Sequence, residues 1–140
     1  MTNLLSKYIS SVLCILMLVF ANGCGKNPIN GDLDGQWQVM DIVPEAPETI
    51  VQGRLYMCFN LHVCQLTSYG SGAQAAGNLK FDSQNNTLSL DFPDIQSERG
   101  LNILKQYGIY SNPVTFEIEM LNSSNLILRD GDVLVVLRKF

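Results

Sequence analysis

The stretch Val114–Leu137, VTFEIEMLNSSNLILRDGDVLVVL, predicts three consecutive antiparallel strands. Apolar residues alternate with threonine and glutamate from Val114 to Met120, which is the pattern of a strand with one buried face. Asn122–Asn125 supplies turn residues, and Asp130-Gly131 is a strong signal for a two-residue hairpin. The stretch therefore predicts a meander in which each strand pairs with the next.

Further strands are predicted upstream of this meander. Gln36–Val43 is the first strand, and Ala76–Phe81 forms a hairpin with Thr87–Phe92 across the polar turn Asp82–Asn86. The small residues of Gly70–Gly77 are predicted to form a loop. Seven or eight short strands at regular spacing indicate an all-β antiparallel fold, either a barrel or a sandwich.

One segment, Gly53–Tyr69, is predicted to be a single long strand. Its apolar residues alternate without a break from Leu55 to Val63, and the sequence there offers no Gly or Pro for a turn. On one strand, Cys58 and Cys64 would lie roughly 20 Å apart, too far for a disulfide. We therefore expect two free thiols. The alternative is a tight hairpin centred on Leu61, which would bring the two cysteines within reach of each other.

Ser97–Tyr107 departs from the strand pattern and predicts a short helix, with Gly108 just past its end as the C-terminal cap. The helix would cover one end or flank of the sheet. The last strand, Val133–Phe140, is apolar on both faces as far as Leu137, which indicates cover on both sides. The helix is the candidate for the second cover.

The N-terminus has the features of a secretory signal. A single positive charge, Lys7, precedes the apolar run Val12–Ala21, which is shorter than the roughly 20 residues of a membrane-spanning helix. Ala21-Asn22-Gly23-Cys24 resembles the lipobox of bacterial lipoproteins. The resemblance implies that Cys24 is acylated and becomes the mature N-terminus, and Gly25 after it favours the outer membrane. The alternative is an ordinary signal peptide with a chance cysteine.

These features predict three segments: a signal peptide at 1–23, a lipidated N-terminus and flexible tether at 24–33, and one domain at 34–140. The net charge of the whole chain is −4, and it becomes more negative when Lys7 leaves with the signal. An acidic chain without a basic cluster argues against a nucleic-acid partner and against electrostatic docking to anionic lipid. Attachment to the membrane would therefore depend on the acyl chains.

Both ends of the domain resemble a known family. Gly35-Gln36-Trp37 resembles the Gly-x-Trp signature of lipocalins, up-and-down β-barrels that hold small apolar ligands. Leu101–Gly108, Phe116–Ile118, Ser124–Leu128 and Leu137–Phe140 resemble the small lipocalin-like lipoproteins of Gram-negative gut anaerobes. The resemblance runs from about Leu33 to Phe140. It implies a lipocalin-like barrel of about eight strands, here with one short helix before the last three strands.

Gly35, Trp37 and Arg138 are predicted to close this barrel. In a closed meander the first and last strands are antiparallel neighbours, so the start of one meets the end of the other. Trp37 is therefore expected to pack against the guanidinium of Arg138, and lipocalins show a similar arginine–tryptophan contact. Trp37 would be a structural plug at the base of the barrel.

The residues that could perform chemistry are few. His62 is the single histidine and shares a face of the predicted strand with Cys58 and Cys64. His62 and Cys64 could reach one metal ion, but Cys58 lies about 13 Å from His62, too far to join them. Glu117 and Glu119 are expected on a solvated outer face, and the sequence contains no nucleophile motif or phosphate-binding loop. We expect no enzymatic activity, no metal site and no cofactor.

Two functions remain. The first is binding of a small apolar or amphipathic ligand through an open barrel end, rimmed by Pro44–Ile50 and Gly70–Gly77. The second is a non-enzymatic interaction module of the cell envelope with a filled barrel. The predicted inward residues are bulky enough to fill the interior: Trp37, Val39, Phe59, Phe81, Phe92, Phe116 and Met120. The presence or absence of a cavity of a few hundred Å3 discriminates between the two functions.

Overall fold

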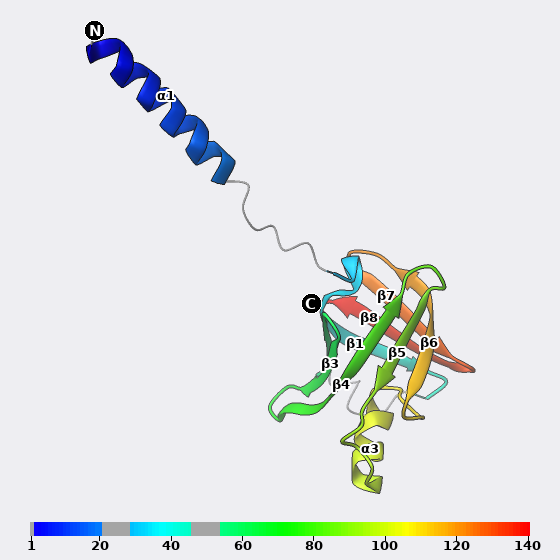
Figure 1. Cartoon of the computed structure of the whole chain (residues 1–140). Helices are drawn as coiled ribbons and strands as arrows, with labels where there is room; N and C mark the ends of the chain where they lie inside the picture. The colour runs from blue at the N-terminus through cyan, green and yellow to red at the C-terminus, as the bar shows by residue number, and fades with distance from the viewer. Residues whose placement is uncertain (1, 21–28, 46–53) are drawn as a thin grey trace.

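The computed structural model describes residues 2–20, 29–45 and 54–140. Eight antiparallel strands form a closed barrel in which each strand pairs with the next and the last pairs with the first (Figure 1). The strands are β1 (Gly35–Val43), β2 (Leu55–Asn60), β3 (Val63–Ser68), β4 (Gly72–Asp82), β5 (Thr87–Asp91), β6 (Val114–Leu121), β7 (Asn125–Asp130) and β8 (Val133–Lys139). The predicted all-β meander barrel is confirmed, and the sandwich alternative is wrong.

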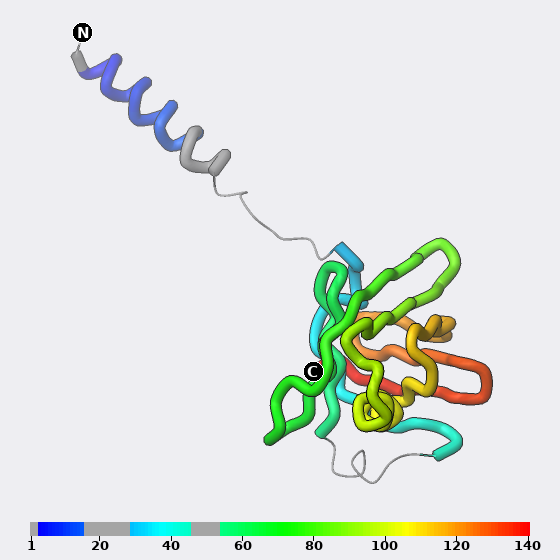
Figure 2. The backbone as a smooth tube through the Cα atoms, turned by 60° about the horizontal axis from the view of Figure 1, so that its bottom comes forward, coloured from blue at the N-terminus to red at the C-terminus, as the bar shows by residue number. Residues whose placement is uncertain are grey.

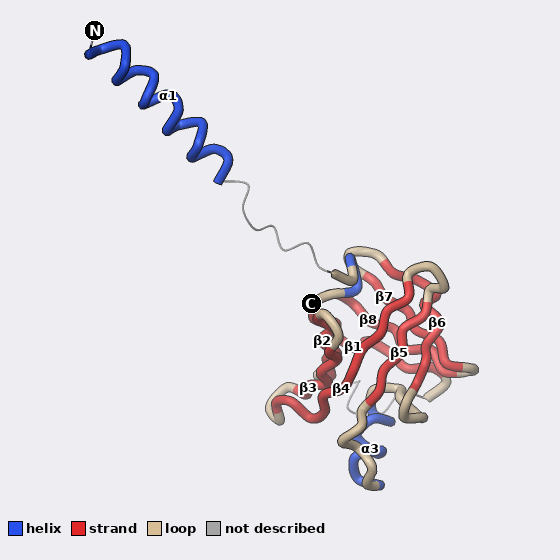
Figure 3. Tube along the Cα trace, viewed as in Figure 1, coloured by secondary structure: helices blue, strands red, loops and turns tan. Residues whose placement is uncertain are grey.

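In the described part of the chain, three helical segments accompany the strands (Figure 3). Helix α1 (Thr2–Phe20) lies in the predicted signal segment, and the 3-10 helix η1 (Gly31–Leu33) immediately precedes β1. Helix α3 (Glu98–Gln106) confirms the predicted helix before the last three strands. Ser97 caps it by accepting a hydrogen bond from the Gly100 amide, and Gly108 follows it with a positive φ of 79°.

The two ends of the barrel differ in the segments that cover them. We call the end formed by η1, the β2–β3 turn and the C-terminus the tether end, since the N-terminal segment joins the barrel there (Figure 1). We call the opposite end, where α3 lies, the helix end. Figure 2 shows α3 nearly end-on in front of this end.

The prediction of one long strand over Gly53–Tyr69 is wrong, because the chain turns sharply at Leu61-His62 between β2 and β3. Leu61 adopts a left-handed conformation with φ of 55°, which is uncommon for a residue with a branched side chain. Asn30 donates a side-chain hydrogen bond of 2.8 Å to the Leu61 carbonyl. A partner distant in sequence thus supports a turn that lacks the usual Gly or Asn.

Cys58 and Cys64 are free thiols despite this hairpin, as predicted. Cys64 pairs with Phe59 across the hairpin and is buried, whereas Cys58 lies on the partly exposed outer face. Burial raises the pKa of the Cys64 thiol, with a further contribution from Cys58. The two sulfur atoms are kept apart by strand alternation, and not by the length of a single strand as expected.

Two further predictions from alternation are wrong. Gly70–Gly77 is not a loop throughout, since β4 begins at Gly72 and only its first two residues belong to a turn. Met120 does not face inward, because the β6–β7 register shifts between Ile118 and Met120. This bulge turns the Met120 side chain outward, where it is 45% exposed.

Helix α3 does not cover the outer face of β8. Its principal strand contact is with β4, at the helix end. The outward side chains Leu134 and Val136 of β8 therefore stay partly exposed, whereas Val135 and Leu137 are buried in the barrel. The apolar residues on the outward face of β8 are therefore not covered by α3 and form part of the outer surface of the barrel.

Candidate functional site

The interior of the barrel is the first place to seek a ligand site, and its described side chains fill it. The following residues from seven of the eight strands have no accessible surface: Trp37, Val39, Met57, Phe59, Cys64, Leu66, Leu88, Leu90, Phe116, Leu126, Leu128 and Val135. The eighth strand, β4, contributes Leu79, which retains 4%. A side chain with no accessible surface borders no space that admits a water molecule. No water-sized cavity therefore adjoins these twelve residues.

At the tether end, η1 folds under the barrel and is held by polar contacts to its backbone. The indole Nε1 of Trp37 donates a buried hydrogen bond of 2.8 Å to the Leu33 carbonyl. The Lys139 ammonium donates to the carbonyls of Asp32 and Asp34 at 2.7 and 2.6 Å. The same Nζ lies 4.6 Å from the centroid of a Trp37 ring, which is a cation–π contact.

The predicted contact between Trp37 and Arg138 is therefore wrong, and Lys139 takes that place. Strands β1 and β8 are antiparallel neighbours as expected, but their register pairs Trp37 with Lys139 and Gln38 with Arg138. Successive side chains point to opposite faces, so a shift of one residue moves Arg138 to the outer face. There its Nη2 lies 3.5 Å from the Gln38 Oε1.

Gly35, the third predicted closure residue, lies where β1 leaves η1. Its φ of 135° disfavours any residue with a side chain, and an added Cβ would lie 2.8 Å from the Lys139 Cε. The glycine thus leaves room for the lysine that reaches the backbone of η1. The position of Cys24 lies outside the described residues.

Asn30 fixes the point at which the N-terminal segment joins the barrel. It is only 8% exposed, and its amide nitrogen donates to Asp34 Oδ1 at 2.7 Å as well as to the Leu61 carbonyl. Its backbone N–H donates to Asp34 Oδ2 at 3.2 Å. Asn30 therefore ties the tether to η1 and to the β2–β3 turn together.

At the helix end, the segment that follows α3 packs into the barrel mouth. Leu104, Tyr107 and Ile109 are at most 1% exposed. A Cβ added to Gly108 would lie 2.5 Å from Val135 Cγ2 and 3.3 Å from Ile42 Cδ1, so the backbone itself touches the inner wall. The mouth is thus plugged by the chain between α3 and β6.

Two polar contacts hold this plug in place. The Tyr107 hydroxyl donates a hydrogen bond of 2.7 Å to Gln74 Oε1 on β4, and burial raises the pKa of the phenol, with a contribution from Cys64. The Asn112 side chain accepts from the Phe92 N–H at 2.9 Å and donates to the Phe92 carbonyl at 2.9 Å and the Ile95 carbonyl at 3.2 Å. Asn112 thereby joins the start and the end of the excursion that contains α3.

The small residues expected to leave the mouth open instead make room for an aromatic side chain. A Cβ on Gly77 would lie 2.6 Å from the Phe92 ring and 2.4 Å from the Asp91 carbonyl oxygen. Phe92 has no accessible surface. Of the other predicted rim, Pro44–Ile50, residues 46–50 lie outside the described residues.

The outer surface carries an apolar row that runs across β6, β7 and β8 and ends at β1, where Val136 pairs with the exposed Asp41. Met120 pairs with Ile127, and Ile127 pairs with Val136. Beside them, Leu134 pairs with Val43, which is 40% exposed, and Met40 at the β1 bulge is 41% exposed. We call Met40, Val43, Met120, Ile127, Leu134 and Val136 the outer apolar face. An ion pair between Arg129 and Glu119 flanks it and raises the pKa of the arginine.

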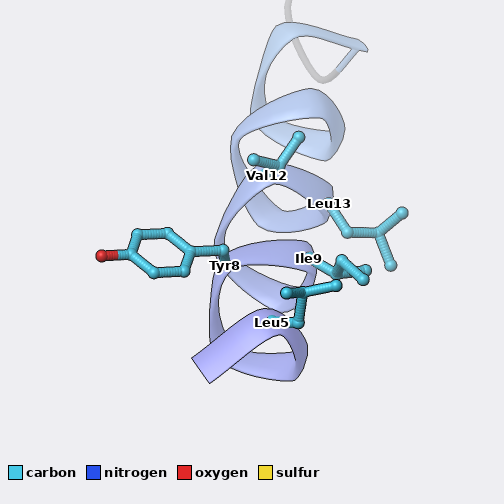
Figure 4. A pocket seen from close by; sticks show the side chains of 5 residues that line it. All are labelled: Leu5, Tyr8, Ile9, Val12 and Leu13. Atoms are coloured by element: carbon cyan, nitrogen blue, oxygen red, sulfur yellow. The ribbon is translucent and has the colours of Figure 1, made fainter. Parts of the chain in front are cut away.

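In the part of the chain that the structure describes, a hollow of about 430 Å3 lies outside the barrel wall at the tether end and is lined by Ile29, Asn30, Gly31, His62, Lys80, Phe81 and Ser83. Along α1, apolar side chains project from the helix: Leu5, Tyr8, Ile9, Val12 and Leu13 (Figure 4). Among the described residues, no helix is both long and apolar enough to cross a bilayer.

The described part of the chain contains no group of three His, Cys, Asp or Glu residues that could hold a metal ion. His62 is exposed in the β2–β3 turn, away from the face on which it was placed beside the cysteines. Glu117 and Glu119 are exposed, as expected for a solvated outer face.

Comparison with known proteins agrees with this geometry. The sequence profile of a lipocalin-like domain matches residues 16–140. The chain belongs to the lipocalin-like domain family. Among solved structures, a lipocalin-like protein from Bacteroides uniformis is similar with 18% identity and a TM-score of 0.57, covering 79% of this chain and all of the other. An uncharacterized protein from Bacteroides eggerthii gives 15% identity and a TM-score of 0.55, covering 76% and 98%.

These similarities show the lipocalin-like fold and no more. No curated protein matches the sequence. Within this lipocalin-like barrel, sequence reasoning missed Lys139, Asn30 and Tyr107 as the residues that close the two ends. A signal existed for the plug at Ile109, because the residue after the glycine that ends a helix commonly packs against the third residue from the helix end, here Leu104, to whose carbonyl the Ile109 N–H donates a hydrogen bond.

Proposed function

We propose that this protein is a lipid-anchored lipoprotein of the cell envelope whose filled lipocalin-like barrel binds a partner protein through its outer surface, without catalysis. The observation that carries the proposal is the filled interior. A lipocalin that stores a ligand needs a cavity of about 300 Å3 or more. Here bulky inward side chains and the segment after α3 occupy that volume.

The anchor is supported by the sequence Ala21–Cys24 and by the apolar segment before it. We expect the acyl chains on Cys24 to hold the protein in the outer membrane, because Gly25 follows the cysteine and not an aspartate. Replacing Cys24 by serine should release the protein into the soluble fraction. Retention of the Cys24→Ser variant in membranes would mean that the attachment is not lipid.

The partner surface is supported by the outer apolar face. Outward side chains of a barrel wall are ordinarily polar, because they face water. Six apolar side chains on four adjacent strands depart from this rule, and those of Met40, Val43 and Met120 are at least 40% exposed. Contiguous apolar patches with polar rims are typical of sites of protein–protein interaction.

Photo-crosslinking in intact cells tests this face. A photoreactive residue at Met120 should give one discrete adduct with an envelope protein, whereas the same residue at Gln65, exposed on the outer face of β3, should give none. The change Val136→Glu should abolish the adduct, and Gln65→Glu should preserve it. Equal adducts from Met120 and Gln65, or no adduct from Met120 in a folded and acylated protein, would contradict the proposal.

A small apolar ligand is the competing function, and it is the usual one for open barrels of this class. It would require the segment Leu104–Ile109 to leave the mouth, since its side chains Leu104, Tyr107 and Ile109 are buried there and the backbone of Gly108 lies against Ile42 and Val135 on the inner wall. Such a movement exposes three buried apolar side chains to water, which is unfavourable unless the ligand replaces them. The filled barrel is therefore the better supported state.

A further inference from the structure

We propose that the tether end of the barrel rests on the lipid surface that holds the anchor, so that α3 points away from the membrane. The proposal rests on the lipid anchor at Cys24 proposed above and adds the orientation of the domain. It follows from the length of the tether, from the side chains exposed at its end of the barrel and from the polar contacts that fix η1.

The tether is short because Asn30 is fixed. Asn30 is buried and hydrogen-bonded to both Asp34 and the Leu61 carbonyl, so only the residues between Cys24 and Asn30 separate the anchor from the barrel. Six residue steps span at most about 21 Å when fully extended. The rim of the barrel beside Asn30 therefore stays within this distance of the acylated cysteine.

The helix end is too far away to take the place of the tether end. Strand β1 has nine residues. A strand of that length rises roughly 30 Å along its own axis, or about 23 Å along a barrel axis tilted by about 40°. With the barrel axis upright on the membrane, the helix end could touch the bilayer only if the barrel inverted, and the tether is shorter than the barrel is tall.

The tether end exposes side chains suited to a lipid surface. Ile29 is 65% exposed, Leu61 is 48% exposed, Val63 is 50% exposed and the C-terminal Phe140 is 75% exposed. Ile29, Leu61 and Val63 belong to separate segments, yet the fold gathers them around η1 and the β2–β3 turn. The Phe140 backbone N–H donates to the Gln36 carbonyl near the same end, and the Phe140 ring packs edge-to-face against Tyr56 on the outer wall, with 5.2 Å between ring centroids. Apolar side chains at one end of a tethered domain can enter the boundary between headgroups and acyl chains.

The hollow of about 430 Å3 lies at this same end. Its lining places the Lys80 side chain and His62 beside Ile29 and Phe81. A cation beside apolar groups is the composition of residues that lie at headgroup level, with the apolar part toward the acyl chains and the charge toward phosphate. The contact is mainly apolar, since the chain as a whole is acidic.

Fluorescence quenching on vesicles tests the orientation with the complete acylated protein. The background variant is Cys58→Ser, because Cys64 has no accessible surface and does not react with a label. A fluorophore is attached at Leu61→Cys, or at Asn102→Cys on the exposed surface of α3. The vesicles consist of phosphatidylcholine and phosphatidylethanolamine, with a fraction of headgroups carrying a nitroxide quencher. We expect loss of most of the fluorescence at residue 61 and little loss at residue 102.

A matched pair of variants separates docking from simple tethering. Combining Ile29→Asp with Phe140→Asp should restore fluorescence at residue 61 while the protein still sediments with the vesicles. The control, Tyr69→Asp at the helix end, should leave the quenching unchanged. Equal quenching at residues 61 and 102, or quenching at residue 61 that survives the double variant, would overturn the orientation while leaving the anchor intact. Failure to sediment with vesicles would overturn the anchor and the orientation together.

Discussion

The two ends of the barrel are closed by different kinds of interaction. At the tether end, Trp37 and Lys139 donate hydrogen bonds to backbone carbonyls of the segment Asp32–Asp34. At the helix end, Leu104, Tyr107 and Ile109 fill the mouth with apolar side chains, and the Tyr107–Gln74 hydrogen bond adds one polar contact between plug and wall. The closure at the tether end depends on hydrogen bonds between particular atoms, and the closure at the helix end depends mainly on the volume of the side chains that fill the mouth.

The difference indicates which closure sets the fold and which sets the function. The tether end holds the first and last strands together, so it determines whether the barrel closes at all. The helix end determines whether the closed barrel has room for a ligand. Loss of the polar contacts at the tether end should therefore cost stability alone, whereas loss of the plug at the helix end should also open the mouth to a ligand.

The largest loss of stability is expected from Trp37→Ala. The ring is fully buried, so its removal should lower the free energy of unfolding by about 3–5 kcal/mol. Urea denaturation followed by circular dichroism measures this change. A loss below about 1 kcal/mol would show that closure of the tether end does not depend on the indole.

Tyr107→Ala tests the opposite end and should cost about 3 kcal/mol. It should also open the mouth, so that an apolar dye binds to the folded variant and shows enhanced fluorescence. The control Tyr107→Phe removes only the hydroxyl that donates to Gln74 and should cost about 1 kcal/mol without dye binding. Dye binding by Tyr107→Phe, or no dye binding by Tyr107→Ala, would contradict the claim that side-chain volume closes the helix end.

Lys139→Met and Arg138→Met decide which cation supports the tether end. The Lys139 ammonium contacts two carbonyls and the Trp37 ring, so its loss should lower the free energy of unfolding by about 1–2 kcal/mol. Arg138 is exposed on the outer face, and its loss should cost less than about 0.5 kcal/mol. A larger loss of stability for Arg138→Met than for Lys139→Met in urea denaturation would instead support a contact of Arg138 with Trp37.

Alkaline pH should weaken the barrel through Cys64. Burial raises the pKa of this thiol, so the folded protein keeps it protonated while the unfolded chain ionises above a pKa of about 8.5. This contribution to stability is present below about pH 8.5 and is lost as the pH rises, amounting to about 0.8 kcal/mol between pH 7 and 9. Cys64→Ala should remove this part of the pH dependence, and an unchanged slope would assign it elsewhere.

Alternation and turn residues sufficed to predict an antiparallel meander, because β6, β7 and β8 bury one face each and are separated by polar turns. The choice of a barrel over a sandwich came from the family resemblance. They failed at Leu61, where the turn uses a left-handed leucine that is supported by Asn30 from outside the hairpin. They also failed at Met120, since a bulge is a property of the paired strands and not of one strand. The sequence around Leu61 does not show the contact with Asn30, and the sequence of β6 does not show its pairing with β7.

The closure residues were only partly predictable for a similar reason. Gly35 and Trp37 occupy the tether end as the family resemblance implied. The choice between Arg138 and Lys139 depends on the β1–β8 register, because a shift of one residue exchanges the faces on which their side chains lie. The plug at the helix end was unpredictable from composition. The same small residues, such as Gly77, suit an open mouth or a mouth filled by Phe92, and only the path of the chain distinguishes them.

The filled barrel is tested most directly by titrating an environment-sensitive apolar dye into the mature chain from residue 24, expressed without the signal and carrying Cys24→Ser. Circular dichroism first establishes that the domain is folded. We expect no saturable binding up to about millimolar dye, since the described inward side chains border no cavity of the size that ligands need. Saturable one-to-one binding that fatty acids displace would show that the mouth opens in solution, and the barrel would then be a ligand carrier.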